Sequence, residues 1–281
     1  MRLKLAAAAC GTVIGFAFAA GVALATDWTP LPPVATPPPA ATPVQTAPAA
    51  EAVAVPQIDP RADQVLGRTC AALGAADAFT FHAEILFDEV LPSAVKVQFA
   101  GAIDFAVQRP DELSIDYHSD LGGKELWYRK DKLTIFDQPH QMYASLEVPD
   151  SIDQMLDRVA EMHNLKLPLS NLAYSDPCER IHRQILFGTY VGVNDVNGAP
   201  CDHLAFSSRN IDFQLWTARS GKPLPRKLVI NYRTEPGSPE FIAVLSDWKF
   251  PKHIAESRFR PQIPQDARRI EFLKVKEVNH E

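Results

Sequence analysis

The fold is decided by the stretch from Phe187 to Phe250, which reads FGTYVGVNDVNGAPCDHLAFSSRNIDFQLWTARSGKPLPRKLVINYRTEPGSPEFIAVLSDWKF. Its apolar residues alternate with polar ones in runs that short polar segments separate, which predicts five consecutive strands. Asn197-Gly198 is a tight-turn dipeptide between two such runs, because glycine adopts positive φ without a steric cost. The stretch therefore indicates an antiparallel meander with one buried face and one more polar face.

The chain ahead of this meander has strand patterning of the same kind. Residues 94–107 alternate almost without interruption, and the alternation of Phe79, Phe81, Ile85 and Phe87 suggests an equally long partner strand. Further runs of strand-like sequence lie at 113–117, 126–128, 133–136 and 142–146. Together with the meander they give about 11 strands. The two longest, at about 14 residues, exceed the usual length of five or six, and long coiled strands suit a curved sheet or half-barrel.

Two stretches have helical patterning instead. Asp59-Pro60 supplies an N-cap and a first-turn proline, and the apolar stripe that follows ends at Gly74. Ser151 and Gln154 have the spacing of a capping box. The apolar stripe of this second helix contains Ile152, Met155, Leu156, Val159 and Met162. Residues 167–172 and 176–185 predict shorter helical pieces. Helices inserted midway through an antiparallel sheet usually cover one of its faces.

The N-terminus carries a targeting segment. Arg2 and Lys4 precede an uncharged apolar run over residues 5–25 that ends in an A-x-A site, which is typical of a secretory signal peptide. The run is also long enough to span a bilayer, so an uncleaved inner-membrane anchor is the alternative. Lipidation at Cys10 is a third reading. All three place the rest of the chain in the periplasm.

Amino-acid composition divides residues 26–281 into a linker, a folded domain and a tail. Residues 26–58 are rich in proline and alanine without hydrophobic periodicity, which predicts an extended linker of on the order of 90 Å. The folded domain is expected over residues 59–274, and residues 275–281 form a polar tail. Loss of residues 1–25 removes two positive charges and takes the formal net charge from −6 to −8. This charge argues against nucleic acid as a partner. The nearest basic cluster, residues 252–269, is interrupted by prolines and reads as a solvated edge.

Several strings resemble a known family. They are TYVGVNDVNGAPCDHLAF, IDFQLW, PLPRKLVINY, FIAVLSDWKF and LAYSDP at residues 172–177. Between about Asp59 and Phe272 the chain is similar to a family of predicted periplasmic proteins of unknown function, related to the bacterial lipoprotein carriers and receptors of the LolA/LolB-like superfamily. The resemblance implies an α+β fold: an antiparallel, unclosed half β-barrel of about 11 strands, with helices covering the concave face and an apolar cavity. It implies no catalytic residues.

Three cysteines lie beyond the targeting segment, so one disulfide and one free thiol are expected in an oxidising compartment. We favour the pair Cys178–Cys201, which would tie the helical insertion to the first hairpin of the meander. Cys70 reads as a small buried apolar residue. The alternative is a nucleophilic Cys201 beside His203, but such catalysis also needs an orienting group that the sequence does not reveal.

Metal and cofactor chemistry is not indicated. The eight histidines include no HxH or HExxH pair, and the sequence has no P-loop, dinucleotide fingerprint or G-x-S-x-G motif. We therefore expect no metal, no cofactor and no enzyme activity.

Aromatic and methionine side chains suggest a binding function instead, because a curved sheet that does not close leaves an apolar hollow. The side chains expected to line this cavity are Phe99, Ile103, Phe105, Trp127, Phe136, Met155, Met162 and Trp216. The expected ligand is a lipid, a lipoprotein acyl chain or another hydrophobic molecule, with the helix around Met155 and Met162 acting as a lid. The alternative is an envelope structural or protein-interaction module whose core is filled by its own side chains. Membrane association would run through residues 5–25 if they are not cleaved.

Overall fold

The structure is a computed structural model that describes residues 57–163, 165 and 167–272. The expected signal segment, the tail at 275–281 and all but the last two residues of the expected linker lie outside these residues. Those two residues, Gln57 and Ile58, form a short strand. Two residues that the sequence assigned to the linker are thus part of the sheet.

The elements are as follows. The strands are β1 (Gln57–Ile58), β2 (Ala78–Val90), β3 (Lys96–Gln108), β4 (Glu112–Ser119), β5 (Gly122–Arg129), β6 (Lys132–Asp137), β7 (Met142–Glu147), β8 (Phe187–Val196), β9 (Ala199–Ser207), β10 (Asp212–Ala218), β11 (Pro225–Asn231), β12 (Glu240–Lys249) and β13 (Arg268–Arg269). The helices are α1 (Pro60–Gly74), α2 (Ile152–His163) and α3 (Pro177–His182), with 3-10 turns η1 (Ser170–Leu172) and η2 (Glu256–Phe259).

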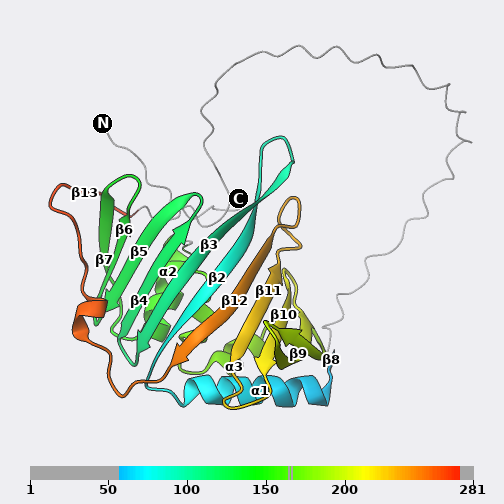
Figure 1. Ribbon diagram of the computed structural model, residues 1–281. Coiled ribbons are helices and arrows are strands. Elements are labelled where there is room, and N and C mark those ends of the chain that lie inside the picture. The colour runs from blue at the N-terminus through cyan, green and yellow to red at the C-terminus, as the bar shows by residue number, and fades with distance from the viewer. Residues whose placement is uncertain (1–56, 164, 166, 273–281) are drawn as a thin grey trace, which may run out of the picture. The chain divides into compact units, whose positions relative to one another are not determined.

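The strands of the described residues belong to one open sheet with the order β1-β8-β9-β10-β11-β12-β2-β3-β4-β5-β6-β7-β13. Across residues 57–272, apart from 164 and 166, this sheet has 13 strands rather than the predicted 11. The additional two, β1 and β13, are two-residue strands that pair in parallel with the edge strands β8 and β7. Two residues carry no readable periodicity, which is why the sequence missed them. The other strands, β2–β12, form antiparallel ladders as expected (Figure 1).

Local sequence explains the hairpins. β2 and β3 pair over their whole length, from Ala78 opposite Gln108 to Val90 opposite Lys96. Asn197 and Gly198 both have positive φ, 50° and 77°, in the turn between β8 and β9. Positive φ at both central residues is the type I′ geometry that matches the twist of the flanking strands. The turn that was read from this dipeptide is confirmed.

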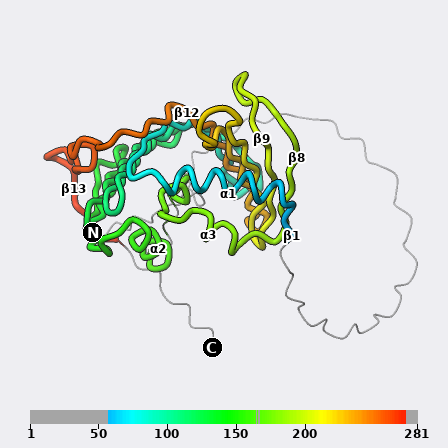
Figure 2. Tube along the Cα trace, turned by 90° about the horizontal axis from the view of Figure 1, so that it is seen from below, coloured from blue at the N-terminus to red at the C-terminus, as the bar shows by residue number. Residues whose placement is uncertain are grey.

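The sheet arches around the three helices, which lie inside its curve (Figure 2). We call the face toward the helices the inner face and the opposite face the outer face. Helix α1 begins as predicted: the Asp59 carboxylate accepts a hydrogen bond from the Arg61 backbone N–H at 2.8 Å, and Pro60 occupies the first turn. Helix α2 buries Ile152, Met155, Leu156 and Val159 against the inner face. The helices therefore cover the concave side, as the resemblance implied.

A segment after β12, residues 250–272, crosses the outer face, and we call it the strap. Its side chains Ile254 and Phe259 are buried against Ala78 and Ala106. Arg268 and Arg269 then pair with β7 as β13, and the Phe272 ring lies 5.5 Å from the His163 ring at the end of α2. The basic stretch at 252–269, read as a solvated edge, is thus part of the fold.

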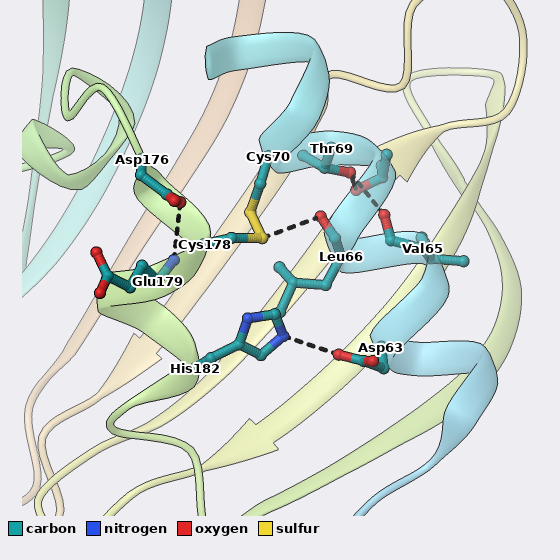
Figure 3. The surroundings of a disulfide bond; sticks show 10 residues. Asp63, Val65, Leu66, Thr69, Cys70, Asp176, Cys178, Glu179 and His182 are labelled. Carbon is teal, nitrogen blue, oxygen red and sulfur yellow. Dashed lines mark hydrogen bonds and ion pairs between the residues drawn. A yellow bond between two sulfur atoms is a disulfide. The ribbon is translucent and has the colours of Figure 1, made fainter.

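The disulfide joins Cys70 to Cys178, not Cys178 to Cys201 as predicted (Figure 3). Cys70 is in the last turns of α1 and Cys178 in the first turn of α3, and the two helices pack together. The Asp63 carboxylate and the His182 ring, 2.8 Å apart, join the same two helices. Cys201 is a free, fully buried thiol on the outer face of β9, where α3 cannot reach it.

Candidate functional site

The candidate site is the inner face, whose side chains form one large apolar cluster. Strand register places Phe81, Phe105, Ile115 and Leu126 in a row across β2 to β5. Since alternate residues of a strand point to opposite faces, residues two apart in each strand join this face. The cluster also contains the inward side chains of α2. Helix α2 thereby covers the part of the inner face around this row.

Four of the eight residues predicted to line a cavity belong to this cluster or pack against it. Ile103, Phe105 and Met155 are almost completely buried in the cluster. Phe99 is partly buried and packs against its margin, with its ring 5.9 Å from that of Phe87.

The prediction was wrong for Trp127, Phe136 and Trp216, which point to the outer face. Trp127 pairs with Ser114 and Thr134, one position out of step with the inner row that contains Leu126. Phe136 is likewise one position from Ile135, which packs against the inner cluster. Trp216 lies on the outer face with Cys201 and stacks on the His203 ring at 3.9 Å.

Met162 also does not join the inner cluster and is half-buried. His163 is the buried residue at this end of α2. Two consecutive residues of a helix point about 100° apart, so Met162 and His163 cannot both lie on the buried side of α2.

Polar contacts hold α2 in place along the side away from the sheet. The Asp153 carboxylate accepts hydrogen bonds from the Ser175 backbone N–H and hydroxyl, at 3.0 and 2.5 Å. Asp157 accepts a hydrogen bond from the Tyr174 hydroxyl at 2.9 Å and pairs with Arg180 at 2.6 Å. Burial and the Asp157 hydrogen bond raise the pKa of Tyr174 well above its ordinary value. A lid movement of α2 would break these contacts and open the core.

Arg109, which sequence reasoning missed, joins the inner elements at the base of the sheet. Its guanidinium donates hydrogen bonds to the backbone carbonyls of Leu73, Ala76, Ala173 and Tyr174. These carbonyls belong to the end of α1, to the residues just after it and to the segment before α3. Burial lowers the pKa of Arg109 from its usual value. In the sequence, Arg109 stands out only because it precedes Pro110 at the turn into β4, and this position does not reveal which carbonyls its guanidinium contacts.

The margin of the inner face near the β2–β3 hairpin is less covered. Register places Ile230, Phe241, Phe87 and Phe99 in one row there. Phe87 and Phe241 are buried, whereas Phe99, Ile230 and the neighbouring Leu228 are only partly buried. Apolar side chains are accessible in this row, as they also are at Tyr117, Ile135 and Leu146 toward the β7 edge of the inner face, and we call the row the open margin.

The catalytic alternative at Cys201 is not supported by the geometry. The Cys201 thiol is fully buried, and burial raises its pKa, which disfavours the thiolate that a nucleophile requires. Both ring nitrogens of His203 contact amide side chains, those of Asn194 at 2.9 Å and Gln214 at 3.0 Å. Burial lowers the pKa of His203. Cys201 and His203 therefore have the surroundings of structural residues, not those of a nucleophile and its general base.

In residues 57–163, 165 and 167–272, no helix is long and apolar enough to cross a membrane. The same residues contain no group of three or more histidine, cysteine, aspartate or glutamate side chains that could hold a metal ion.

Residues 62–273 match the family described as predicted periplasmic protein, DUF2092. The chain belongs to this family. Membership confirms the family read from the strings at 172–250 and agrees with the periplasmic location expected from the targeting segment. No curated protein matches the sequence of this DUF2092 chain.

Several solved structures are similar to the DUF2092 chain. An uncharacterised conserved protein from Thermus thermophilus has a TM-score of 0.46 at 9% identity, covering 75% of this chain and 99% of that one. Lipoprotein LppX from Mycobacterium tuberculosis has a TM-score of 0.45 at 11% identity, covering 70% and 100%. A LolA superfamily protein from Nitrosomonas europaea has a TM-score of 0.34 at 8% identity, covering 71% and 97%. The last belongs to the superfamily expected from the sequence. At these scores no function is transferred.

Proposed function

We propose that this protein binds a hydrophobic ligand, a lipid or an acyl chain, at the open margin of the inner face. The observation that carries the proposal is the incomplete cover of a continuous apolar surface. Side chains of α2 pack into the buried part of this surface, while Phe99, Leu228 and Ile230 on the same face remain partly accessible. Apolar surface left in contact with water is unfavourable, by about 25 cal/mol per Å², and an apolar ligand would remove it.

The expected entry route is the open margin rather than a lid at α2. The hydrogen bonds from Ser175 and Tyr174 to α2, together with the buried Met155, favour a helix that stays in place. A bound acyl chain would lie along the row from Ile230 to Phe99. Each methylene that it buries would contribute about 0.8 kcal/mol.

Native mass spectrometry of the protein purified from the periplasm, followed by lipid extraction, tests the proposal. A defined additional mass that matches a phospholipid or acyl species is expected. Ile230→Asp places a charge at the open margin and should reduce the bound lipid. The matched control is Ile242→Asp, because Ile242 is also partly buried but faces outward on the neighbouring strand. A protein that stays free of lipid after incubation with membrane lipids would contradict the proposal.

One observation favours a second candidate function, a protein-interaction module of the envelope. Three of the six large apolar residues that are exposed in the described part of the chain, Phe187, Val191 and Val193, lie on β8. β8 is an edge strand that β1 covers only at Phe187 and Gly188. An exposed apolar edge strand is a template for pairing with another chain. Val193→Lys should abolish capture of a protein partner by this edge while lipid binding stays unchanged.

A further inference from the structure

A pocket of 440 Å³ lies on the outer face, on the opposite side of the sheet from the open margin. β2, β3 and β12 form its floor, and the strap forms one wall. The side chains that matter for its chemistry are Thr80, His82, Asp104, Asp247, Lys249 and Arg258. Its volume falls within the range of about 300–1,000 Å³ that is usual for small-molecule sites.

The local backbone explains how these groups converge. The β12–β2 ladder shifts register between Ser246 and Lys249, and Asp247 has a left-handed φ of 53° in this bulge. A bulge redirects the side chains that it contains, and bulges are frequent beside functional sites. Lys249 is thereby placed opposite Thr80. Arg258 is held at the wall that the strap forms, because its neighbours in the strap, Ile254 and Phe259, are buried.

Two charges of the pocket are already compensated. The His82 ring contacts the Asp104 carboxylate at 2.9 Å and the Glu84 carboxylate at 3.2 Å. The hydrogen bond with Asp104 raises the pKa of His82. Asp104 therefore has a cationic partner once His82 is protonated, and a ligand need not supply one.

Three charged side chains of the pocket have no partner among the residues that the structure describes, and two of them, Asp247 and Lys249, are exposed to water. The side chains of Lys249, Arg258 and Asp247 make no hydrogen bond or ion pair with any residue of the described part of the chain. A simple anion would satisfy the two cations and leave Asp247 as an unfavourable like charge. A molecule that carries both an anionic and an ammonium group would satisfy all three. Phosphate suits two cations and a threonine hydroxyl because its several oxygens accept charge-assisted hydrogen bonds.

We propose that this pocket binds a zwitterion in which a primary ammonium group is linked by a short spacer to a phosphate. Lys249, Arg258 and Thr80 hold the phosphate, and Asp247 holds the ammonium. The same chemistry occurs in a free phosphoethanolamine and in the head group of a phosphatidylethanolamine. The pocket is separate from the open margin and does not depend on the function proposed for it.

Calorimetric titration of the purified protein with phosphoethanolamine tests the pocket, with inorganic phosphate and ethanolamine as comparison ligands. Phosphoethanolamine is expected to bind more tightly than either. Lys249→Ala and Arg258→Ala should each weaken it at least about tenfold, because each removes a charge-assisted hydrogen bond. Asp247→Asn should remove the advantage over inorganic phosphate. Lys252→Ala is the matched control, since Lys252 is a neighbouring exposed lysine that does not line the pocket.

Unchanged affinity in Lys249→Ala, or no binding of phosphoethanolamine, would overturn the proposal. Lys249 is exposed, so this variant is expected to keep the thermal stability of the wild type even if Arg258→Ala loosens the strap. The source of the ligand is identified with vesicles. Binding to phosphatidylethanolamine vesicles, but not to phosphatidylcholine vesicles, that is lost in Lys249→Ala identifies a head group. Binding of the soluble compound alone identifies a free molecule. Lipid retention at the open margin is measured in the same variants, so failure of one proposal is distinguishable from failure of the other.

Discussion

Removal of the Cys70–Cys178 disulfide is expected to destabilise the protein strongly while it leaves the inner face intact. The two cysteines are separated by 108 residues. Cross-linking a loop of this length lowers the entropy of the unfolded chain and stabilises the fold by at most about 5 kcal/mol. Because measured values usually fall below this limit, Cys70→Ala/Cys178→Ala should lower the free energy of unfolding by about 3–5 kcal/mol. For a domain of this size the melting temperature should fall by roughly 6–20 °C.

The assay is equilibrium unfolding in guanidinium chloride, with and without a reductant. Reductant should bring the wild type close to the double variant and should leave the double variant unchanged. The matched control is Cys201→Ala, because Cys201 is free and buried. It should cost about 1 kcal/mol and keep the response to reductant. Peptide mapping without reduction should recover a Cys70–Cys178 peptide. A Cys178–Cys201 peptide, or equal stability of the double variant and the wild type, would refute the reasoning.

Three further changes test other parts of the structure. Phe259→Ala should lower the free energy of unfolding by about 3–5 kcal/mol in chemical denaturation, since Phe259 is the strap side chain that is fully buried against the outer face; a loss below about 1 kcal/mol would mean that the strap is not docked. Arg109→Lys should not restore the stability lost in Arg109→Ala, because an ammonium cannot serve four backbone carbonyls arranged around a planar guanidinium; equal melting temperatures of Arg109→Lys and the wild type would contradict this. The His82 pKa is raised in the fold, so its stabilising contribution is complete below the unfolded value near 6.5 and is lost as pH rises through the folded pKa. Proton NMR should therefore find a His82 pKa above 6.5 that falls in Asp104→Asn, and an unshifted value in the wild type would contradict the contact.

Strand order within each half of the sheet was readable because alternation and turn residues are local signals. The assignment of faces was less secure, and β5 shows why. Leu126, Trp127 and Tyr128 are three consecutive buried residues, so no polar position marks which of them point outward. This pattern arises because the strap contacts β4 and β5 on the outer face, and a strand covered on both sides loses its alternation.

The disulfide and the strap were missed for a related reason. The Cys70–Cys178 pairing depends on the packing of α1 against α3, which no local pattern encodes. The strap contains prolines, charges and only isolated apolar residues, such as Ile254 and Phe259, so it has no period to read. The outer pocket could not be predicted for both reasons, because it depends on non-local packing and on the strap. Its charges come from three strands and the strap, and they converge only after the chain has folded.

The strap also has a consequence for how the protein is made. It is synthesised and exported after every other element, yet it covers Ala106 and pairs with the β7 edge at Met142. A growing or partly exported chain therefore carries a bare apolar patch and an unpaired edge strand, both of which favour association with other chains. The patch and the edge are covered only once residues up to Arg269 have arrived. We accordingly expect truncations that remove the strap to yield aggregated protein, even though they leave strands β1–β12 intact.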